Sequence, residues 1–283
     1  MTLKSIYDIA LDSADGQSNF LEQFRGKATL IVNTTVGCGN ANQMEVLQWL
    51  QEKYAGEHFQ VVAIPTNDYC GPGITHGKWS EGITCGADSA NYGKDVYGAT
   101  FQFSQMVSSI PSDGVSLQLG VEPGHNGLGQ AYGEPHELYK TIRDHQRAAQ
   151  NKLKSNGLDP MTMFKDKYHS WWLNRGFYNG DWMGGNFEKY LVDKDGFVSK
   201  HYQCTVLNWD SEKTVKEMAK ESGKVIDIGM GRSKKIFEEE WAVVCQDIEE
   251  LIAGKKSIIN PVSELTVAPK DASSIEDVAI SYA

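Results

Sequence analysis

Two short apolar runs in the first quarter of the chain flank an amphipathic segment. Residues 28–33 combine aliphatic and β-branched side chains, which predicts a buried strand. Residues 42–54 place their apolar side chains at helical spacing and predict an amphipathic helix (Val46, Leu47, Leu50 and Tyr54). Residues 59–64 repeat the strand pattern and stop at Pro65. Strand, helix and strand in this order predict a βαβ unit with two parallel strands in one sheet.

The second half of the chain has three further patterns. Residues 134–154 are helical in spacing. Residues 190–202 hold two short β-rich runs around the turn sequence Asp193-Lys194-Asp195-Gly196, which predicts a hairpin. Residues 235–253 predict a strong helix with one apolar side (Ile236, Trp241, Val244, Ile248 and Leu251).

Three segments between these patterns are rich in other residue types. Residues 68–90 and 108–134 are rich in Gly, Ser and Pro and are expected to form loops. Residues 158–184 are dense in aromatic side chains, which indicates local burial against the domain or against a partner.

Composition and charge narrow the class of protein. The chain has 283 residues and a formal net charge of −10, so an acidic surface would repel phosphate backbones and no nucleic-acid partner is expected. No apolar run is long enough for a secretory signal or a membrane span, so we expect no membrane association and a cytoplasmic location.

Five widely spaced cysteines argue against a disulfide framework (Cys38, Cys70, Cys85, Cys204 and Cys245). No pair has C-x-x-C spacing and no two histidines have H-x-x-x-H spacing. A dithiol motif, a zinc knuckle and a metal or other cofactor are therefore not expected.

Cys38 is the cysteine whose surroundings favour chemistry. It lies between the end of a predicted strand and the start of a predicted helix, where backbone N–H groups and the positive end of the helix dipole favour a thiolate. Ligands of open α/β sheets bind at the carboxyl ends of strands, and a glycine on each side leaves the sulfur accessible. The alternative is a buried structural cysteine, which is common.

Four segments, in order, resemble the signatures of the glutathione peroxidase family. Residues 26–39 read GKATLIVNTTVGCG, which resembles G-K-x-x-L-I-x-N-V-A-S-x-C-G with Cys38 at the reactive position. Residues 64–69 read IPTNDY and are similar to F-P-C-N-Q-F-G, followed by Cys70-Gly71 with one extra residue. Residues 185–196 read GNFEKYLVDKDG and resemble W-N-F-x-K-F-L-V-D-x-x-G. A weaker match is residues 97–101 (YGATF), which are near the family's Y-G-V-T-F-P. The resemblance covers about residues 5–104 and 134–204.

The resemblance implies an α/β, thioredoxin-like fold: a central mixed sheet flanked by helices, here with loop and helix insertions and an extended C-terminal tail. We expect one domain over residues 1–258, with insertions at about 105–133, 145–184 and 205–234, followed by a tail over 259–283. A minimal peroxidase of this type needs about 100 residues fewer.

The resemblance also implies a catalytic set with two departures. Asn186 is kept, but Asp68 stands where the family has Gln, and Gly185 stands where it has Trp. A carboxylate near a thiolate raises the thiol pKa, and a lost indole N–H removes a hydrogen-bond donor. Trp182 could fill the gap, although a place in the core is the more ordinary role for such a residue.

The implied activity is that of a thiol peroxidase, with antioxidant action in the response to oxidative stress. Cys38 would reduce hydrogen peroxide or an organic hydroperoxide through a sulfenic acid, and Cys85 or Cys70 would resolve it, unless no internal thiol does. A thioredoxin-like protein or glutathione would act as reductant. Cys204 and Cys245 are interpreted as structural.

A second function of a different class is consistent with the same residues. Extra aromatic-rich segments on a compact domain often contact other chains. With two catalytic residues replaced, the chain could be a catalytically degraded peroxidase-like domain that serves as a structural or interaction protein, in a homo-oligomer or a larger assembly.

Overall fold

The structure is a computed structural model, which describes the following parts of the chain: residues 2–36, 38, 40–66, 83, 85–109, 134–157, 185–204, 206–208 and 234–262. The predictions for Asp68, Cys70 and Trp182 concern residues outside these ranges. So do those for residues 158–184 and for the tail beyond Val262.

A five-stranded mixed sheet forms the centre of the described residues, in the order β3-β2-β1-β4-β5. Its strands are β1 (Ala28–Thr34), β2 (Phe59–Pro65), β3 (Gln102–Phe103), β4 (Lys189–Val192) and β5 (Val198–Tyr202). Strands β1, β2 and β3 are parallel, whereas β4 runs antiparallel to β1, and β5 antiparallel to β4. β1 is therefore central, which explains why all seven of its residues are buried.

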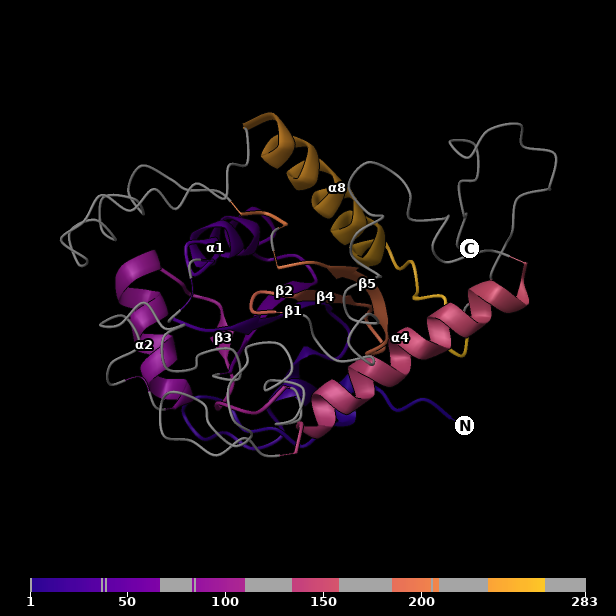
Figure 1. Ribbon diagram of the computed structural model, residues 1–283, viewed down its shortest axis with the longest axis horizontal. Helices are drawn as coiled ribbons and strands as arrows, with labels where there is room; N and C mark the ends of the chain where they lie inside the picture. The colour runs from indigo at the N-terminus through magenta and orange to yellow at the C-terminus, as the bar shows by residue number, and fades with distance from the viewer. Residues whose placement is uncertain are drawn as a thin grey trace, which may run out of the picture.

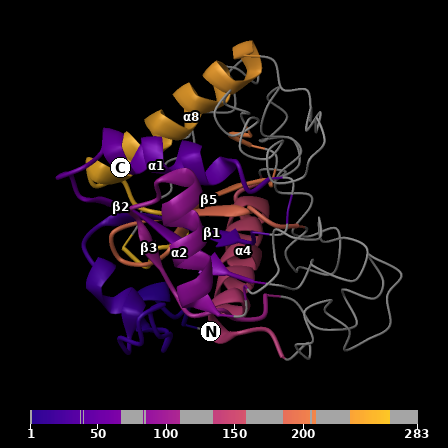
Figure 2. The same ribbon diagram turned by 90° about the vertical axis from the view of Figure 1, so that its left-hand side faces the viewer.

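Helices cover both faces of the sheet (Figure 1). They are α1 (Gln43–Lys53), α2 (Gly86–Tyr97), α4 (Glu137–Ser155) and α8 (Lys234–Ile252), with short 3-10 turns η1 (Ile6–Asp8) and η2 (Phe20–Phe24). In Figure 1, α2 lies beside β3, at the edge of the sheet opposite β5, and Figure 2 looks at the molecule from that side, with α2 in the foreground.

The pleat of β1 divides the core into two. Leu30 and Val32 pack with residues of α1 and α8, whereas Ile31 between them packs with α4 and the two 3-10 turns. This alternation follows from the two-residue period of a strand. The face formed with α1 is the one that carries Cys38.

Most of the expected elements are confirmed. The βαβ unit is present with β1 and β2 parallel, residues 190–202 belong to the antiparallel pair β4–β5, and the two expected late helices are α4 and α8. The α/β, thioredoxin-like fold class with a mixed sheet is therefore confirmed.

The expected loop over residues 68–90 is wrong at its end, because α2 begins at Gly86. This segment is poor in apolar residues and contains Gly, Ser and Asn, which are weak helix formers. Tertiary contacts outweigh that propensity: Gly93 packs closely against Phe103, and the start of the helix is capped by Cys85 and Asp88.

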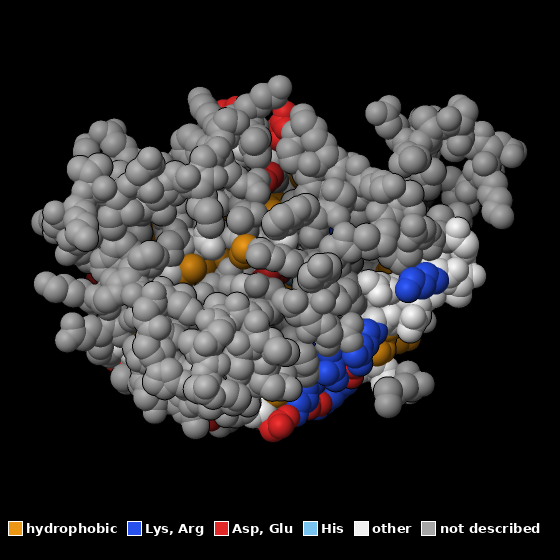
Figure 3. Space-filling view, in the orientation of Figure 1, with side chains coloured by type: hydrophobic (Ala, Val, Ile, Leu, Met, Phe, Trp, Pro, Cys, Tyr) orange, Lys and Arg blue, Asp and Glu red, His pale blue; other side chains and the backbone are white. Residues whose placement is uncertain are grey.

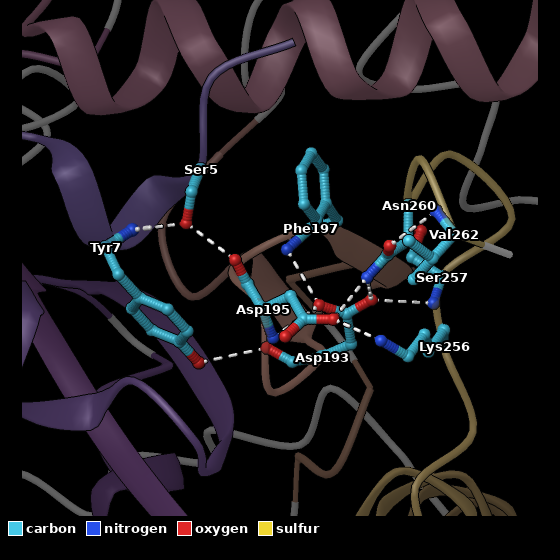
Figure 4. Close-up of polar contacts among 9 residues, drawn as sticks. All are labelled: Ser5, Tyr7, Asp193, Asp195, Phe197, Lys256, Ser257, Asn260 and Val262. Carbon is cyan, nitrogen blue, oxygen red and sulfur yellow. Dashed lines mark hydrogen bonds and ion pairs between the residues drawn. The ribbon is translucent and has the colours of Figure 1, made fainter.

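The β4–β5 turn accepts hydrogen bonds from segments near both ends of the described chain (Figure 4). One carboxylate oxygen of Asp193 accepts hydrogen bonds from the amides of Asp195 and Phe197 within the turn. Its other oxygen accepts from the Ser257 amide at 2.8 Å and from Asn260 at 3.0 Å. The segment after α8 is thereby held against the hairpin.

The chain start reaches the same turn (Figure 4). Ser5 donates to the Asp195 carbonyl at 2.7 Å, and the buried Tyr7 hydroxyl donates to the Asp193 carbonyl at 3.1 Å. Gly196 has a φ of +93°, and a Cβ there would lie 2.0 Å from the Ser5 hydroxyl. Glycine is therefore required at this position for both its backbone conformation and its close approach.

The visible surface in Figure 3 shows Lys and Arg side chains along α4. This helix contains five basic residues (Lys140, Arg143, Arg147, Lys152 and Lys154) against the acidic pair Glu137 and Asp144. In the described part of the chain no helix is long and apolar enough to cross a membrane.

Candidate active site around Cys38

Cys38 lies in the connection from β1 to α1. The amide of Ala41 donates to the Cys38 carbonyl at 3.0 Å, and the amide of Gln43 donates to the Asn40 carbonyl at 3.0 Å. These overlapping turns bring the chain from the strand end into the helix, so Cys38 stands at the helix entrance as predicted. Its side chain is partly exposed and also packs against the core beside α1.

Three N–H groups face the Cys38 sulfur. The backbone amide of Asn40 donates at 3.4 Å, and the side-chain amides of Asn40 and Asn186 donate as well. Hydrogen bonds to the charged form of an acid stabilise that form. The structure thus brings the two expected residues Cys38 and Asn186 together, and it adds Asn40, which the sequence analysis did not identify.

A relay of buried asparagines fixes the orientation of Asn40. Asn42 donates from Nδ2 to Asn208 Oδ1 at 3.0 Å, and Asn208 donates in turn from Nδ2 to Asn40 Oδ1 at 3.0 Å. Because Oδ1 of Asn40 is the acceptor, its Nδ2 is the atom that remains to donate to the sulfur. Asn40, Asn42 and Asn208 are 7%, 0% and 4% exposed, so water does not compete strongly with this relay.

Asn33 fixes the position of Asn186. It is fully buried, donates from Nδ2 to the Gly185 carbonyl at 3.1 Å, and accepts from the Glu188 amide at 2.7 Å. The backbone carbonyl of Asn33 also accepts from the Phe187 amide at 2.8 Å. One side chain at the end of β1 therefore holds the segment on both sides of Asn186.

The same segment contains an unusual backbone conformation. Phe187 has a φ of +62°, in the left-handed region that side chains with a Cβ rarely adopt. Its ring is fully buried in the core on the α1 face. Burial of the ring and the hydrogen bonds of Asn33 offset the cost of this conformation, which turns the chain so that residue 186 meets the sulfur.

Burial raises the pKa of the Cys38 thiol above its ordinary value, although the three donors lower it. A backbone N–H donor was expected from the position at the helix entrance, but the expectation that the site favours a thiolate is wrong in its net direction. Burial of the sulfur destabilises the thiolate more than the three hydrogen bonds stabilise it.

Cys204 is close to this site, on the segment that follows β5. Gln43 in the first turn of α1 donates to the Cys204 carbonyl at 2.6 Å. A Cβ placed on Gly185 would lie 3.7 Å from the Cys204 sulfur. Cys204 is 7% exposed. The cysteine interpreted as structural is therefore packed against the residue that precedes Asn186.

Several buried polar atoms on the segments that carry Cys38, Asn186 and Cys204 have no hydrogen-bond partner in the described part of the chain. They are Thr34 Oγ1, Gln43 Oε1, Asn186 Oδ1 and Gln203 Nε2. Each unpaired buried polar atom lowers the stability of the fold unless a further molecule hydrogen-bonds it. These atoms make the interior of the site polar. Such a site can hydrogen-bond a small polar molecule such as a peroxide.

Cys85 is placed away from these contacts. It is exposed and caps the start of α2, where its sulfur accepts the Asp88 amide and lies 3.2 Å from the Asp88 carboxylate. A surface pocket of about 340 Å³ lies beside it, lined among others by Asp12 and Gln105. The contacts recorded for the described residues do not join Cys85 to Cys38.

Asp68, Cys70 and Trp182 lie outside the described residues, so their places relative to Cys38 stay predictions. Within the described parts no group of three His, Cys, Asp or Glu side chains is arranged to hold a metal ion.

The sequence had only a weak signal for the additional site residues. Asn40 and Asn42 follow Cys38 closely, and their spacing could have indicated polar side chains at the helix entrance. Asn208 is 168 residues from Asn40, and nothing in its neighbourhood indicates the pairing.

Comparisons with known proteins find similarity to one family over the first part of the chain. The glutathione peroxidase family model matches residues 6–109. A glutathione peroxidase homolog BsaA of Staphylococcus epidermidis is 35% identical over 107 residues, which are 37% of this chain and 61% of the relative. A putative chloroplastic glutathione peroxidase 7 of Arabidopsis thaliana is 25% identical over 217 residues, 76% of this chain and 67% of the relative.

The match is partial in length and distant in structure. The chain spans about 61% of the length of the staphylococcal relative. Among solved structures, that of T. cruzi GPX1 is 19% identical with a TM-score of 0.42, covering 79% of this chain and 99% of that one. The family match at residues 6–109 includes β1, Cys38, α1 and β2. Over residues 6–109 the chain is therefore similar to the glutathione peroxidase family, and the curated relatives that it matches are homologs of that family.

Proposed function

We propose that the protein is a thiol peroxidase in which Cys38 reduces hydrogen peroxide or an organic hydroperoxide. Its similarity to the glutathione peroxidase family over residues 6–109 supports a thiol-based redox function. The observation that carries the proposal is the set of three N–H donors directed at a partly exposed sulfur at the entrance of α1.

The chemistry follows from that geometry. The Cys38 thiolate attacks one peroxide oxygen, the O–O bond breaks, and the leaving hydroxide or alkoxide takes up a proton to become water or an alcohol. The Asn40 and Asn186 amides stabilise the negative charge on sulfur before the attack and on oxygen during it. Cys38 becomes a sulfenic acid. Asp68 is a further candidate at the site, by the resemblance alone.

A thiol reductant completes the cycle in this proposal. We propose a thioredoxin-like protein or glutathione, because a sulfenic acid or a disulfide needs two electrons to return to the thiol. Cys85 and Cys70 are the candidates for a resolving thiol that come from the sequence.

The test measures peroxide consumption coupled to either reductant, for the native protein and for Cys38→Ser. We expect the native rate to exceed the variant rate by at least about 10²-fold, the scale at which removing one catalytic group acts. Cys245→Ser is the matched control, because Cys245 lies on α8 beside Tyr54, which follows the far end of α1. Its rate should match the native rate. Equal rates for Cys38→Ser and native protein would refute the proposal.

One observation favours the second function, that of a catalytically degraded domain in an assembly. Burial raises the pKa of Cys38 and so lowers the fraction of thiolate, which slows any attack on peroxide. The same assay separates the two functions, since a degraded domain would consume no peroxide with either reductant. Light scattering of that protein would then show an assembly rather than a monomer.

A further inference from the structure

We propose that Cys204 is the thiol that resolves oxidised Cys38, a step that rests on the proposed peroxidase function. The two cysteines are far apart in the chain, and the sequence singles out Cys85 and Cys70 instead. The structure favours Cys204 through the residues that separate the two sulfurs.

Two consecutive residues, Gly185 and Asn186, each lie beside one of the two thiols. The side-chain amide of Asn186 hydrogen-bonds the Cys38 sulfur, and the position of a Cβ on Gly185 is 3.7 Å from the Cys204 sulfur. Consecutive Cα atoms are about 3.8 Å apart, so one sulfur meets the side chain of Asn186 and the other lies beside the residue directly before it.

The glycine at position 185 is what makes room for this arrangement. A methyl group there would reach ordinary contact with both Cβ and Sγ of Cys204. A larger side chain would occupy the space where Cys204 sits, and an indole would displace it. The residue that departs from the family signature is therefore the one against which the second thiol packs.

Cys204 is also tied to the helix that Cys38 introduces. Gln43, which donates to the Cys204 carbonyl at 2.6 Å, lies five residues after Cys38. Asn208, four residues after Cys204, also hydrogen-bonds Asn40 and Asn42 beside Cys38, so the two thiol-bearing segments are joined at several points. Cys204 itself lies beyond the last residue of β5. A local movement of Cys204 breaks no strand pairing. The Cα atoms of Cys38 and Cys204 can therefore approach to the separation of about 4.4–6.8 Å that a disulfide needs.

The other described cysteines are worse placed. Cys85 is exposed, and its sulfur is engaged in the cap of α2. Cys245 lies beside Tyr54, which follows the last residue of α1, and an eleven-residue helix separates that end from the entrance where Cys38 lies. At 1.5 Å rise per residue this helix is about 16 Å long, well beyond disulfide reach.

The step balances without a further reagent. Peroxide first oxidises Cys38 to the sulfenic acid. The Cys204 sulfur then attacks the Cys38 sulfur, an S–S bond forms, the S–O bond breaks, and the hydroxyl leaves as water with the proton of the Cys204 thiol. The unpaired polar atoms Gln43 Oε1 and Asn186 Oδ1 can hydrogen-bond that hydroxyl and the water it forms. The reductant later returns both thiols.

Mass spectrometry of tryptic peptides tests the pairing. Trypsin places Cys38 in the peptide 28–53, Cys204 in 201–213, Cys85 in 79–94 and Cys70 in 54–78, so each disulfide has its own mass. After one equivalent of hydrogen peroxide we expect 28–53 joined to 201–213. In Cys204→Ser and Cys204→Ala that species should vanish, and dimedone should trap the Cys38 sulfenic acid at least tenfold more than in native protein. Cys85→Ser and Cys245→Ser are matched controls in which the Cys38–Cys204 pair still forms.

The outcomes separate this inference from the proposed function. Peroxide that gives a trapped sulfenic acid on Cys38 but joins it to Cys85 or Cys70, or leaves it equally long-lived in native protein and in Cys204→Ser, would refute the inference and leave the peroxidase intact. Diamide, which oxidises thiol pairs without peroxide, gives a second readout. A Cys38–Cys204 disulfide under diamide, with Cys38 inert to peroxide, would support the proximity and overturn both the resolving step and the peroxidase. Failure to pair under either oxidant would refute the proximity itself.

Discussion

Replacement of Asn33 by alanine tests how the site is held in place. The side chain makes two hydrogen bonds, to the Gly185 carbonyl at 3.1 Å and from the Glu188 amide at 2.7 Å, and it is fully buried. Alanine removes both bonds at once. It also leaves the Glu188 amide without this acceptor in a place that water does not reach.

The cost can be worked out from those contacts. One lost hydrogen bond costs about 1 kcal/mol, and a buried N–H left unpaired costs about 2 kcal/mol, so the variant should lose about 3 kcal/mol of unfolding free energy. Since total stabilities are about 5–15 kcal/mol, this is a large fraction. For a chain of this size the melting temperature should fall by about 6–12 °C.

Urea and thermal denaturation followed by circular dichroism measure this loss. Asn91→Ala is the matched control, because Asn91 is exposed on α2 and alanine is the better helix former there. Its stability should change by less than about 0.5 kcal/mol. Asn33→Ala should also slow alkylation of Cys38 by iodoacetamide below its pKa, since Asn186 loses its anchor and the thiolate loses a donor.

Two results would contradict this reasoning. A loss below about 1 kcal/mol would mean that solvent or a shifted backbone replaces both hydrogen bonds. A full loss of stability with unchanged alkylation of Cys38 would mean that Asn33 supports the sheet without positioning Asn186.

Three further outcomes follow from other parts of the structure. Burial holds the pKa of Cys38 above its ordinary value, so alkylation of Cys38 in the folded protein, read out on the tryptic peptide 28–53, should accelerate about tenfold per pH unit from pH 7 upwards. Asn186→Ala should slow this alkylation. A plateau in the rate below pH 8 would contradict the raised pKa. Hydrogen bonds from Lys256 and Asn260 lower the pKa of Asp195 in the folded protein. This carboxylate therefore stabilises the native state above the unfolded pKa of about 4, and the stabilisation is lost as pH falls through the lower folded pKa. The unfolding free energy of Asp195→Asn should consequently fall less between neutral and acid pH than that of the native protein. A Cβ on Gly86 would lie 2.2 Å from the Ser104 carbonyl oxygen, so Gly86→Ala should destabilise by about 2–3 kcal/mol in thermal melts, more than Gly98→Ala, whose Cβ meets no neighbouring atom and which loses only the ease of its +69° φ.

The sequence by itself determined the local elements and the position of the candidate cysteine at the entrance of a helix. The apolar runs of β1 and β2, the period of α1 and the β4–β5 turn are encoded within short stretches, because strand and helix periods are properties of neighbouring residues. The motif around Cys38 and the segment with Asn186 were recognisable for the same reason. The start of α2 was not, since its composition opposes a helix and packing against β3 decides it.

Only the tertiary structure decided how the site is built. Asn33 meets Gly185 across 152 residues, and Asn208 meets Asn40 across 168, because β4 pairs beside β1 and brings the later segment to the end of that strand. Pairs of this kind leave no periodicity in the chain. The direction in which the pKa of Cys38 shifts likewise depends on whether burial or the hydrogen-bond donors have the larger effect. Burial is a property of the packed molecule.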